Sequence, residues 1–391
     1  MRTIGVVTVA RSDYGIYLPI LRRIQADPEL RLKLFVSGMH LSPEFGLTVK
    51  MIEADGFEIA ERVEMLLSSD TPEGIAKSMG LGIMGFSQAF AHQCPDMLTV
   101  LGDRFEMYAA ALAALPFKIP VAHIHGGEVT QGAIDDALRH SMTKLSHLHF
   151  VSTPEYARRV AQLGEEPWRI TVSGAPGLDN LHVIRLLSGE ELEDRFGLRL
   201  QPPPLLVTFH PVTLEYEHTI WQMGELLAAL ADSEMPVVFT MPNADTGGRV
   251  IQQMIKEYVQ TQPSAYAVDN LGTQGYFSLM TLAVAMVGNS SSGIIEAPSF
   301  GLPVINIGTR QSGRVKAANV IDVGYERTDI LEGIHQAVQL KFRERLRQMA
   351  NPYGCGQAST KIVERLKSVP LDERLMMKRF RDLDAAFWDE P

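Results

Sequence analysis

Side chains suited to binding an anion gather in a serine-rich turn late in the chain, at Ser290, Ser291 and Ser292. The turn follows the apolar run 282–287, which is expected to be a buried strand, and it precedes an expected helix start. Backbone N–H groups at such a start are unpaired and the helix dipole favours negative charge, so a phosphate is the expected ligand. Glu296 could accept hydrogen bonds from a ribose diol. An ordinary N-cap is the alternative, because serine is favoured there anyway.

Four carboxylates lie near expected strand ends in the first half of the chain: Asp103, Glu128, Asp135 and Asp136. Carboxylates crowded into a partly dry cleft shift one another's pKa and divide into acid and base roles. They are therefore candidate acid–base groups. Helix capping is the alternative for one of Asp135 and Asp136, whereas Asp103 directly follows a buried run.

Arginines that could clamp a phosphate lie in two turns. Arg11 shares an expected strand-to-helix turn with Asp13, and its guanidinium could bind a phosphate through two N–H groups. A surface ion pair is the alternative for these two residues. Arg310 and Arg314 flank a later turn, and one of the two is expected to be simply solvated.

Histidines beside turns form a further group: His40, His125, His140 and His210. His210 precedes a proline and opens the first loop of the second half, so it is expected to face a cleft. A satisfied structural histidine is the alternative. The spacing of these residues matches no metal-binding pattern, and neither a metal nor a cofactor is expected.

Composition excludes several classes of function. The 391 residues are 46% hydrophobic and 21% charged, as in an ordinary globular protein of two domains. Asp and Glu outnumber Lys and Arg by 46 to 36, and the net charge of −10 argues against nucleic acid or an anionic membrane as a partner. Cys94 and Cys355 form neither a disulfide framework nor a metal spacing. With no signal-peptide pattern and no membrane-spanning run, a cytoplasmic protein is expected.

Strands alternating with helices must position these groups. Apolar runs typical of buried parallel strands fall into two sets, at 4–9, 32–36, 97–101, 121–124, 149–151 and 170–172, and then at 205–209, 237–240, 266–268, 282–287 and 304–307. Helical spacing follows at 16–25, 105–115 and 135–145, whereas 61–85 is less regular. The pattern predicts an α/β protein with two Rossmann-like, doubly wound domains that face a cleft.

The restart of the strand pattern indicates the domain boundaries. The first domain is expected over 1–176 and the second, with the serine turn, over 177–370. Residues 371–391 carry apolar residues at helical spacing and predict a last helix that docks on the body. Neither half has a Gly-x-Gly-x-x-Gly fingerprint, which disfavours a nicotinamide enzyme.

Seven short motifs connect the chain to a known family. They are RSDYG at 11–15, SGMH at 37–40, GDR at 102–104, HIHGGE at 123–128, DDALRH at 135–140, NSSSG at 289–293 and GTRQ at 308–311. With these motifs nearly the whole chain resembles the UDP-N-acetylglucosamine 2-epimerase family, and more closely its hydrolysing branch from sialic-acid-type sugar synthesis. The resemblance implies a glycosyltransferase-B-like fold. It also implies an elimination that removes the C2 proton and UDP, after which water adds to a 2-acetamidoglucal and N-acetylmannosamine is released.

The resemblance implies site residues as well. Those implied for binding the UDP-sugar are Arg11, Asp13, His40, Arg104, Arg139, Asn243, Tyr276, Ser290, Ser291, Ser292, Glu296, Arg310 and Arg314. Among them Tyr276 would stack on uracil, and Arg139 would hold one of the acid–base carboxylates. The catalytic candidates are Asp103, Glu128, Asp135, Asp136, His125 and His210.

One residue departs from the pattern of the family. Many members carry Glu where this chain has His125, and that Glu is among their catalytic candidates. Here either His125 or Glu128 assumes the proton transfer, and the sequence does not decide between them.

Other activities remain open beside a hydrolysing UDP-N-acetylglucosamine 2-epimerase. A close variant would act on UDP-2,4-diacetamido-2,4,6-trideoxyglucose on a route to legionaminic acid. The two substrates differ at C4 and C6 of the sugar, and nothing in the sequence indicates which substituents are recognised there. A non-hydrolysing epimerase, a UDP-sugar glycosyltransferase of the same fold and a non-catalytic nucleotide-sugar sensor are more distant alternatives. The family suggests a homodimer or homotetramer with a small-molecule partner.

Overall fold

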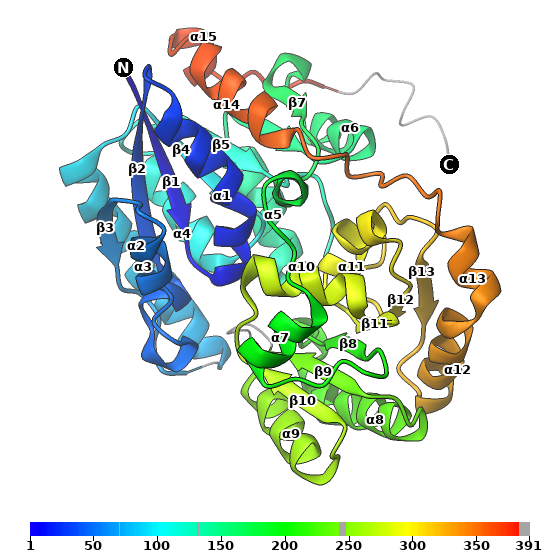
Figure 1. The fold of residues 1–391 in the computed structure, drawn as a ribbon. Coiled ribbons are helices and arrows are strands. Elements are labelled where there is room, and N and C mark those ends of the chain that lie inside the picture. Colours follow the sequence, from blue (N-terminus) through cyan, green and yellow to red (C-terminus); the bar gives the residue numbers. More distant parts are fainter. Residues whose placement is uncertain (70, 131–132, 242–247, 383–391) are drawn as a thin grey trace, which may run out of the picture.

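The computed structural model describes residues 1–69, 71–130, 133–241 and 248–382, and this part of the chain forms two parallel sheets flanked by helices (Figure 1). The first sheet has the order β3 (Ile59–Val63), β2 (Leu30–Ser37), β1 (Arg2–Thr8), β4 (Met97–Leu101), β5 (Val121–Ile124), β6 (Leu148–Val151), β7 (Ile170–Val172). The second has the order β10 (Ala265–Val268), β9 (Val237–Thr240), β8 (Leu205–Thr208), β11 (Ala285–Gly288), β12 (Val304–Ile307), β13 (Val320–Val323). The predicted fold class, two doubly wound α/β units, is confirmed.

Helices connect the strands. Those of the first unit are α1 (Arg11–Ala26), α2 (Val49–Ala54), α3 (Pro72–Gln93), α4 (Phe105–Ala114), α5 (Ile134–Leu145) and α6 (Pro154–Gln162). Those of the second are α7 (Gly189–Phe196), α8 (Thr219–Asp232), α9 (Gly248–Thr261), α10 (Gly272–Leu282), α11 (Ser292–Ile295), α12 (Arg327–Val338) and α13 (Leu340–Arg345). The chain then returns through α14 (Ala358–Ser368) and α15 (Glu373–Met376).

The strand order reverses between β1 and β4 in the first sheet and between β8 and β11 in the second. In open parallel sheets, ligands bind beyond the carboxyl ends of the strands at such a switch point. The loops after β4, β5, β8, β11 and β12 therefore carry the side chains that matter for a site.

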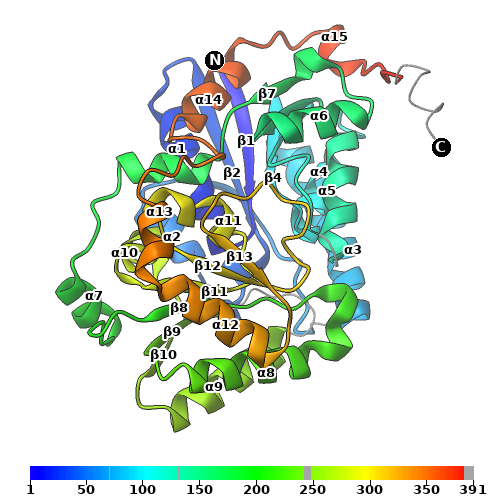
Figure 2. The same cartoon turned by 90° about the vertical axis from the view of Figure 1, so that its right-hand side faces the viewer.

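Helix α14 follows the second unit in sequence but packs on the first unit. Its apolar side chains Ala358, Ile362 and Leu366 are buried in the same core as β1 and β4 of the first sheet. The helix lies beside α1 in both views (Figures 1 and 2). The expected second domain, 177–370, therefore includes a helix that packs in the core of the first sheet.

The C-terminal segment docks as irregular chain over most of its described length. Helix was expected from 371 to 391, but only Glu373–Met376 is helical, residues 377–382 are not, and the remainder lies outside the described residues. Arg169 fixes the segment by donating to the backbone carbonyls of Arg374 and Leu375, each at 2.8 Å. Backbone acceptors, together with the Leu375 side chain of α15 that is buried in the core of the first sheet, thus hold this end of the chain.

Other elements differ from the sequence prediction. The segment 61–85, whose pattern is less regular in the sequence, contains part of β3 and of the 22-residue helix α3. The glycines of α3 lower its helix propensity, so the helix was not predicted from the sequence. In the fold these glycines allow close packing. A Cβ on Gly82 would lie 2.5 Å from the Met65 side chain. The strand expected over 282–287 begins only at Ala285, because α10 extends to Leu282.

Among the residues that the structure describes, no helix is both long enough and apolar enough to span a membrane.

Candidate active site

The loop after β5 is strained. His125 directly follows the strand and has a left-handed backbone with φ of 64°, a conformation that costs a non-glycine residue about 1–3 kcal/mol and clusters at functional sites. Gly127 also has a positive φ, 76°, and a Cβ there would lie 2.5 Å from the carbonyl oxygen of Tyr156. The tight turn brings the side chains of His125 and Glu128 together.

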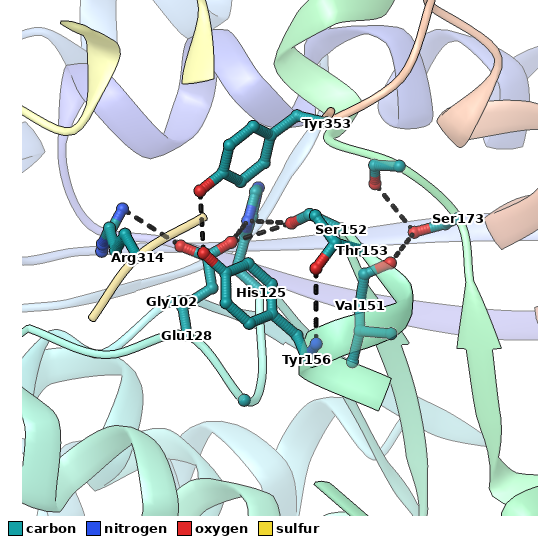
Figure 3. A network of polar contacts seen from close by, with 12 residues as sticks. Gly102, His125, Glu128, Val151, Ser152, Thr153, Tyr156, Ser173, Arg314 and Tyr353 are labelled. Carbon is teal, nitrogen blue, oxygen red and sulfur yellow. Dashed lines mark hydrogen bonds and ion pairs between the residues drawn. The ribbon is translucent and has the colours of Figure 1, made fainter. Parts of the chain in front are cut away.

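His125, Glu128 and Ser152 form a closed triangle of hydrogen bonds (Figure 3). The distance from His125 Nδ1 to Glu128 Oε1 is 2.5 Å, and Ser152 Oγ lies 3.0 Å from Nδ1 and 2.8 Å from Oε1. A carboxylate on Nδ1 favours the tautomer in which that nitrogen carries the proton. His125 Nε2 is then the nitrogen that can take up a proton from a substrate.

Arg314, from the loop after β12, reaches the same carboxylate from the other sheet (Figure 3). Its Nη1 lies 3.1 Å from Glu128 Oε2, and its Nε donates to the carbonyl oxygen of Val129 at 2.8 Å. Burial opposes the ionisation of Glu128, but His125 and Arg314 outweigh this effect and hold the pKa of Glu128 well below its usual range. Glu128 is thus a fixed anion at physiological pH.

Two buried tyrosines fix the Arg314 loop against the first unit. The hydroxyls of Tyr156 and Tyr353 are 2.8 Å apart. Tyr156 accepts the backbone N–H of Val315 at 3.0 Å, and Tyr353 donates to the carbonyl oxygen of the same residue at 2.9 Å. The residue next to Arg314 is therefore held at both backbone groups, which orients the guanidinium toward Glu128.

Asp103 forms a second acidic centre beside the first. It follows Gly102, whose φ is 76°, and it pairs with Arg139 of α5. Thr130 donates to its carboxylate at 3.1 Å. Burial raises the pKa of Asp103, but Arg139, Arg314 and Arg310 together hold it below its usual range. Arginines of both units thus surround this carboxylate.

The two acidic residues at the start of α5 differ in their environment. Asp136 Oδ1 accepts the backbone N–H of Thr130 at 2.7 Å, and its Oδ2 lies 3.6 Å from His140 Nε2. Asp136 therefore bonds to the chain that precedes α5, which differs from the helix capping that was the alternative for one of the two residues. Asp135 precedes it and is half-buried at the helix N-terminus.

Asn289 joins three loops of the second sheet. Its side chain bonds both backbone groups of His210, at 2.7 and 2.8 Å, and its carbonyl oxygen accepts from Gln311 at 2.8 Å and from Arg310 at 3.2 Å. The serine turn next to it remains half-buried, and Ser292 Oγ lies 2.6 Å from the Tyr276 hydroxyl. His210, Arg310 and the serines therefore border one region.

The helix after the serine turn is shorter than expected. Helix α11 spans only Ser292–Ile295, and a 3-10 turn, Ala297–Phe300, follows it. Glu296 lies at this junction and is buried. Burial raises the pKa of Glu296 to about 8, an effect that Glu128 reinforces. The sequence predicted a hydrogen-bond acceptor here, whereas burial favours the protonated acid at neutral pH.

The family of the chain follows from comparison with known proteins. The family model described as UDP-N-acetylglucosamine 2-epimerase matches residues 22–367. The chain belongs to this family. A "GDP/UDP-N,N'-diacetylbacillosamine 2-epimerase (hydrolyzing)" of Campylobacter jejuni is 40% identical over 98% of this chain and 99% of its own. A "UDP-N,N'-diacetylbacillosamine 2-epimerase (hydrolyzing)" of Legionella pneumophila is 35% identical over 97% of this chain and 99% of its own.

Solved structures of 2-epimerases share the fold. The UDP-GlcNAc 2-epimerase from Neisseria meningitidis, bound to UDP-GlcNAc, superposes with a TM-score of 0.80 at 21% identity, over 94% of this chain and 99% of that one. The resemblance stated from the motifs and the glycosyltransferase-B-like fold are thereby confirmed. The family is one of enzymes, as the sequence predicted.

Two of the residues expected to bind substrate in this 2-epimerase family member make hydrogen bonds within the protein. Asp13 accepts the backbone N–H of Ala10 at 2.7 Å inside the N-terminal turn of α1, where burial raises its pKa to about 7. His40 is fully buried between Thr8 and Thr48, at 3.0 and 2.8 Å, and burial lowers its pKa to about 3. Both groups are held by the protein itself.

Three further residues that were predicted to bind substrate differ in their surroundings. Arg11 donates to the carbonyl oxygen of Asp269 and so connects the two units. Arg104 pairs with the buried Glu106 at 3.1 Å. Asn243 lies outside the described residues.

The sequence prediction missed Ser152, Tyr156, Tyr353 and Asn289 as site residues. A signal existed for Ser152, because it directly follows β6 and thus lies at the same sheet edge as Asp103 and His125. For the tyrosines no local signal exists, since their contact joins positions 197 residues apart.

Proposed function

We propose that this chain is a hydrolysing 2-epimerase that converts UDP-2,4-diacetamido-2,4,6-trideoxyglucose and water to UDP and the free, C2-inverted sugar. The observation that carries the proposal is the contact of Arg314, from one unit, with the His125–Glu128 pair of the other. It places a candidate base and a group of arginines at one junction. Elimination of a nucleoside diphosphate needs that combination, because a proton leaves one carbon while charge develops on the diphosphate.

The first step assigned to the site is removal of the C2 proton. His125 Nε2 takes this proton while Glu128 stabilises the imidazolium through Nδ1. The C2–H electrons form the C1–C2 double bond, and the C1–O bond breaks with its electron pair going to UDP. Glu128 itself is a weak base, because its pKa is held low. The structure thus favours His125 over Glu128 for a choice that the sequence left open.

The second step is addition of water to the unsaturated sugar. Water adds its oxygen to C1 and loses a proton, and C2 receives a solvent-derived proton on the face opposite to the one it lost. Asp103, held anionic among Arg139, Arg314 and Arg310, is the group assigned to take the proton from water. Arg310 and Ser290, together with His210, are assigned to the departing diphosphate.

The choice of sugar rests on the relatives. Two proteins aligned over nearly the whole chain are named for N,N'-diacetylbacillosamine carried on UDP or, in one of them, on GDP or UDP. The UDP-linked sugar is the 4-acetamido-6-deoxy substrate proposed here. UDP-GlcNAc is the second candidate, because the family model is described by that substrate. The chemistry at C1 and C2 is the same for both.

Nuclear magnetic resonance of each UDP-sugar with the protein in heavy water tests the proposal. We expect UDP and a free sugar inverted and deuterated at C2, formed faster from the 4-acetamido-6-deoxy substrate. A preference for UDP-GlcNAc would select the second candidate. An epimerised UDP-sugar without release of UDP would indicate a non-hydrolysing enzyme. Turnover only with an added acceptor would indicate a transferase, and UDP-sugar binding without any reaction a sensor.

Removal of one serine hydroxyl tests the diphosphate site. Ser290→Ala is expected to weaken UDP binding by roughly 1–3 kcal/mol, the effect of losing a hydrogen bond to a charged group. Isothermal calorimetry measures this loss. Ser264→Ala is the matched control, since Ser264 is exposed just before β10 at the opposite edge of the same sheet. Equal affinity of Ser290→Ala and wild type would contradict the assignment.

Protonation of Glu296 is expected to be coupled to nucleotide binding. Its pKa of about 8 in the free protein means that it is largely protonated at pH 7. Ribose hydroxyls that donate to the carboxylate favour its ionised form, so UDP binding at pH 7 is expected to release a proton and affinity to rise as pH increases toward 8. Calorimetry in buffers of different ionisation enthalpy measures the proton. A release that persists in Glu296→Gln would contradict this origin.

A further inference from the structure

Tyr276 of α10 reaches the serine turn with its hydroxyl. Its Oη lies 2.6 Å from Ser292 Oγ, and Ser292 Oγ lies 2.9 Å from Ser290 Oγ. The three hydroxyls therefore form a continuous row of hydrogen bonds that ends at Ser290. The resemblance stated from the sequence implies a different role for Tyr276, in which its ring stacks on uracil.

The ring of this tyrosine packs within the protein. It lies against the apolar cluster that joins α7, α10 and the second sheet and that includes Leu192 and Leu279. Helix α10 is itself held close to α7, since a Cβ on Gly275 would lie 3.0 Å from the Phe196 ring. Because the core fixes the ring, the tyrosine hydroxyl is held at one place beside the serine turn.

The backbone of the serine turn is fixed from two other directions. Gly288 has a φ of 136°, and a Cβ there would lie 2.0 Å from the carbonyl oxygen of Thr208. The Asn289 side chain bonds both backbone groups of His210, at 2.7 and 2.8 Å. These contacts set the course of the chain but not the direction of the serine hydroxyls. Tyr276 adds the contact that acts on a hydroxyl itself.

The number of hydrogens in the row gives it a direction. Each hydroxyl has one hydrogen to donate, and Ser290 Oγ also accepts the backbone N–H of Ser292 at 3.4 Å. When Tyr276 donates to Ser292 and Ser292 donates to Ser290, the hydrogen of Ser290 is left for an acceptor outside the row. Burial raises the pKa of Tyr276 to about 12, so its hydroxyl keeps the hydrogen that it donates. Hydrogen bonds aligned in this way polarise one another and strengthen the last donor.

We propose that Tyr276 is a positioning residue that directs the Ser290 hydroxyl toward the diphosphate of the bound nucleotide, acting through Ser292 and not by stacking on the base. This inference rests on the proposed function, which supplies the diphosphate. As the C1–O bond of the substrate breaks, negative charge grows on the diphosphate oxygens. A row of hydroxyls that already points at them stabilises this charge without reorientation.

Tyr276→Phe tests the role, because it keeps the ring and removes only the hydroxyl. The affinity for UDP is expected to fall roughly 2- to 10-fold, the effect of one neutral hydrogen bond, whereas the affinity for uridine should not change. Calorimetry measures UDP binding, and ligand-observed nuclear magnetic resonance measures uridine binding. A stacking role predicts wild-type affinity for both ligands, since phenylalanine stacks as well as tyrosine. That result, or an equal loss of affinity for UDP and uridine, would overturn the proposal.

Tyr266→Phe is the matched control. Tyr266 of β10 packs against the same apolar cluster, but β10 is the edge strand and is separated from β11, which leads into the serine turn, by β9 and β8. The affinities of this variant for UDP and uridine are expected to equal those of the wild type. A loss of UDP affinity as large as that of Tyr276→Phe would show a general effect of core packing and overturn the proposal.

A double-mutant cycle tests the path through Ser292. Ser292→Ala removes the partner of the tyrosine hydroxyl, so Tyr276→Phe should have little further effect on UDP affinity in that background. Fully additive losses would show that Tyr276 acts on the ligand independently of Ser292 and would overturn the proposal. Turnover of a UDP-sugar by the wild type would leave the proposed function intact in that case. The expected binding pattern without turnover of either UDP-sugar would instead overturn the proposed function and leave the positioning role.

Discussion

His125→Asn is expected to reduce kcat by about 100- to 10,000-fold, the range of a lost general base, while UDP affinity stays near that of the wild type. Asparagine is chosen because it tolerates the left-handed backbone that residue 125 adopts, with φ of 64°. Steady-state kinetics and calorimetry give the two quantities separately. Because His125 belongs to the first unit and the serine turn to the second, the substitution should change kcat without changing the affinity for UDP.

Glu128→Gln separates the roles of the two partners. Glutamine retains an oxygen that can accept the Nδ1–H of His125, so the tautomer survives while the stabilising charge is lost. Its kcat should therefore fall less than that of His125→Asn. The reverse order would contradict His125 as the base and return that role to Glu128.

Arg314→Met is expected to destabilise the fold by roughly 3–5 kcal/mol, since it leaves the buried Glu128 without its partner from the second unit. With an unfolding entropy of about 2.1 cal/mol/K per residue over the chain, each kcal/mol shifts the melting temperature by about 1.2 °C, so the melting temperature should drop by about 4–6 °C. Differential scanning calorimetry measures the change. The variant should also raise the pKa of Glu128, because Arg314 is one of the charges that hold it low.

The control for Arg314 is another contact between the units. Arg249 pairs with Glu44 at 2.9 Å, but both side chains are more than 40% exposed, so Arg249→Met should cost only about 0–1 kcal/mol. Adding Glu128→Gln to Arg314→Met should recover part of the lost stability, because a neutral amide is less costly to bury unpaired than a carboxylate. Strictly additive losses would contradict a direct coupling of Arg314 and Glu128.

Much of the architecture was predictable because parallel strands buried on both faces read as short apolar runs. The runs at 97–101 and 121–124 correspond to β4 and β5 without adjustment. The segment 61–85 was not predictable, because the glycines of α3 lower helix propensity, and the reason for them, contact with Met65 and Val63, is a tertiary one. The last strand of the second sheet, β13, was also missed, and its residues are only partly buried.

The sequence by itself determined the fold class, the family and the side chains at the carboxyl ends of the strands, because each of these depends on residue type and local order. It placed Asp103, Glu128, Ser290 and Arg310 in strand-end loops. Asp13 and His40 also occupied such loops, and the sequence could not distinguish them. Only the tertiary structure shows that their polar atoms bond to the protein's own backbone and threonines.

Tertiary structure alone decided how the two units meet. Arg314 and Glu128 are 186 residues apart in sequence, and the two tyrosines that hold the Arg314 loop are 197 residues apart from each other. His125 and the neighbouring arginines outweigh burial and keep Glu128 ionised, and the hydrogen bond to Glu128 favours the tautomer of His125 that leaves Nε2 available. Charge state and tautomer depend on three-dimensional surroundings, and for that reason motifs could name the candidates but not divide the roles among them.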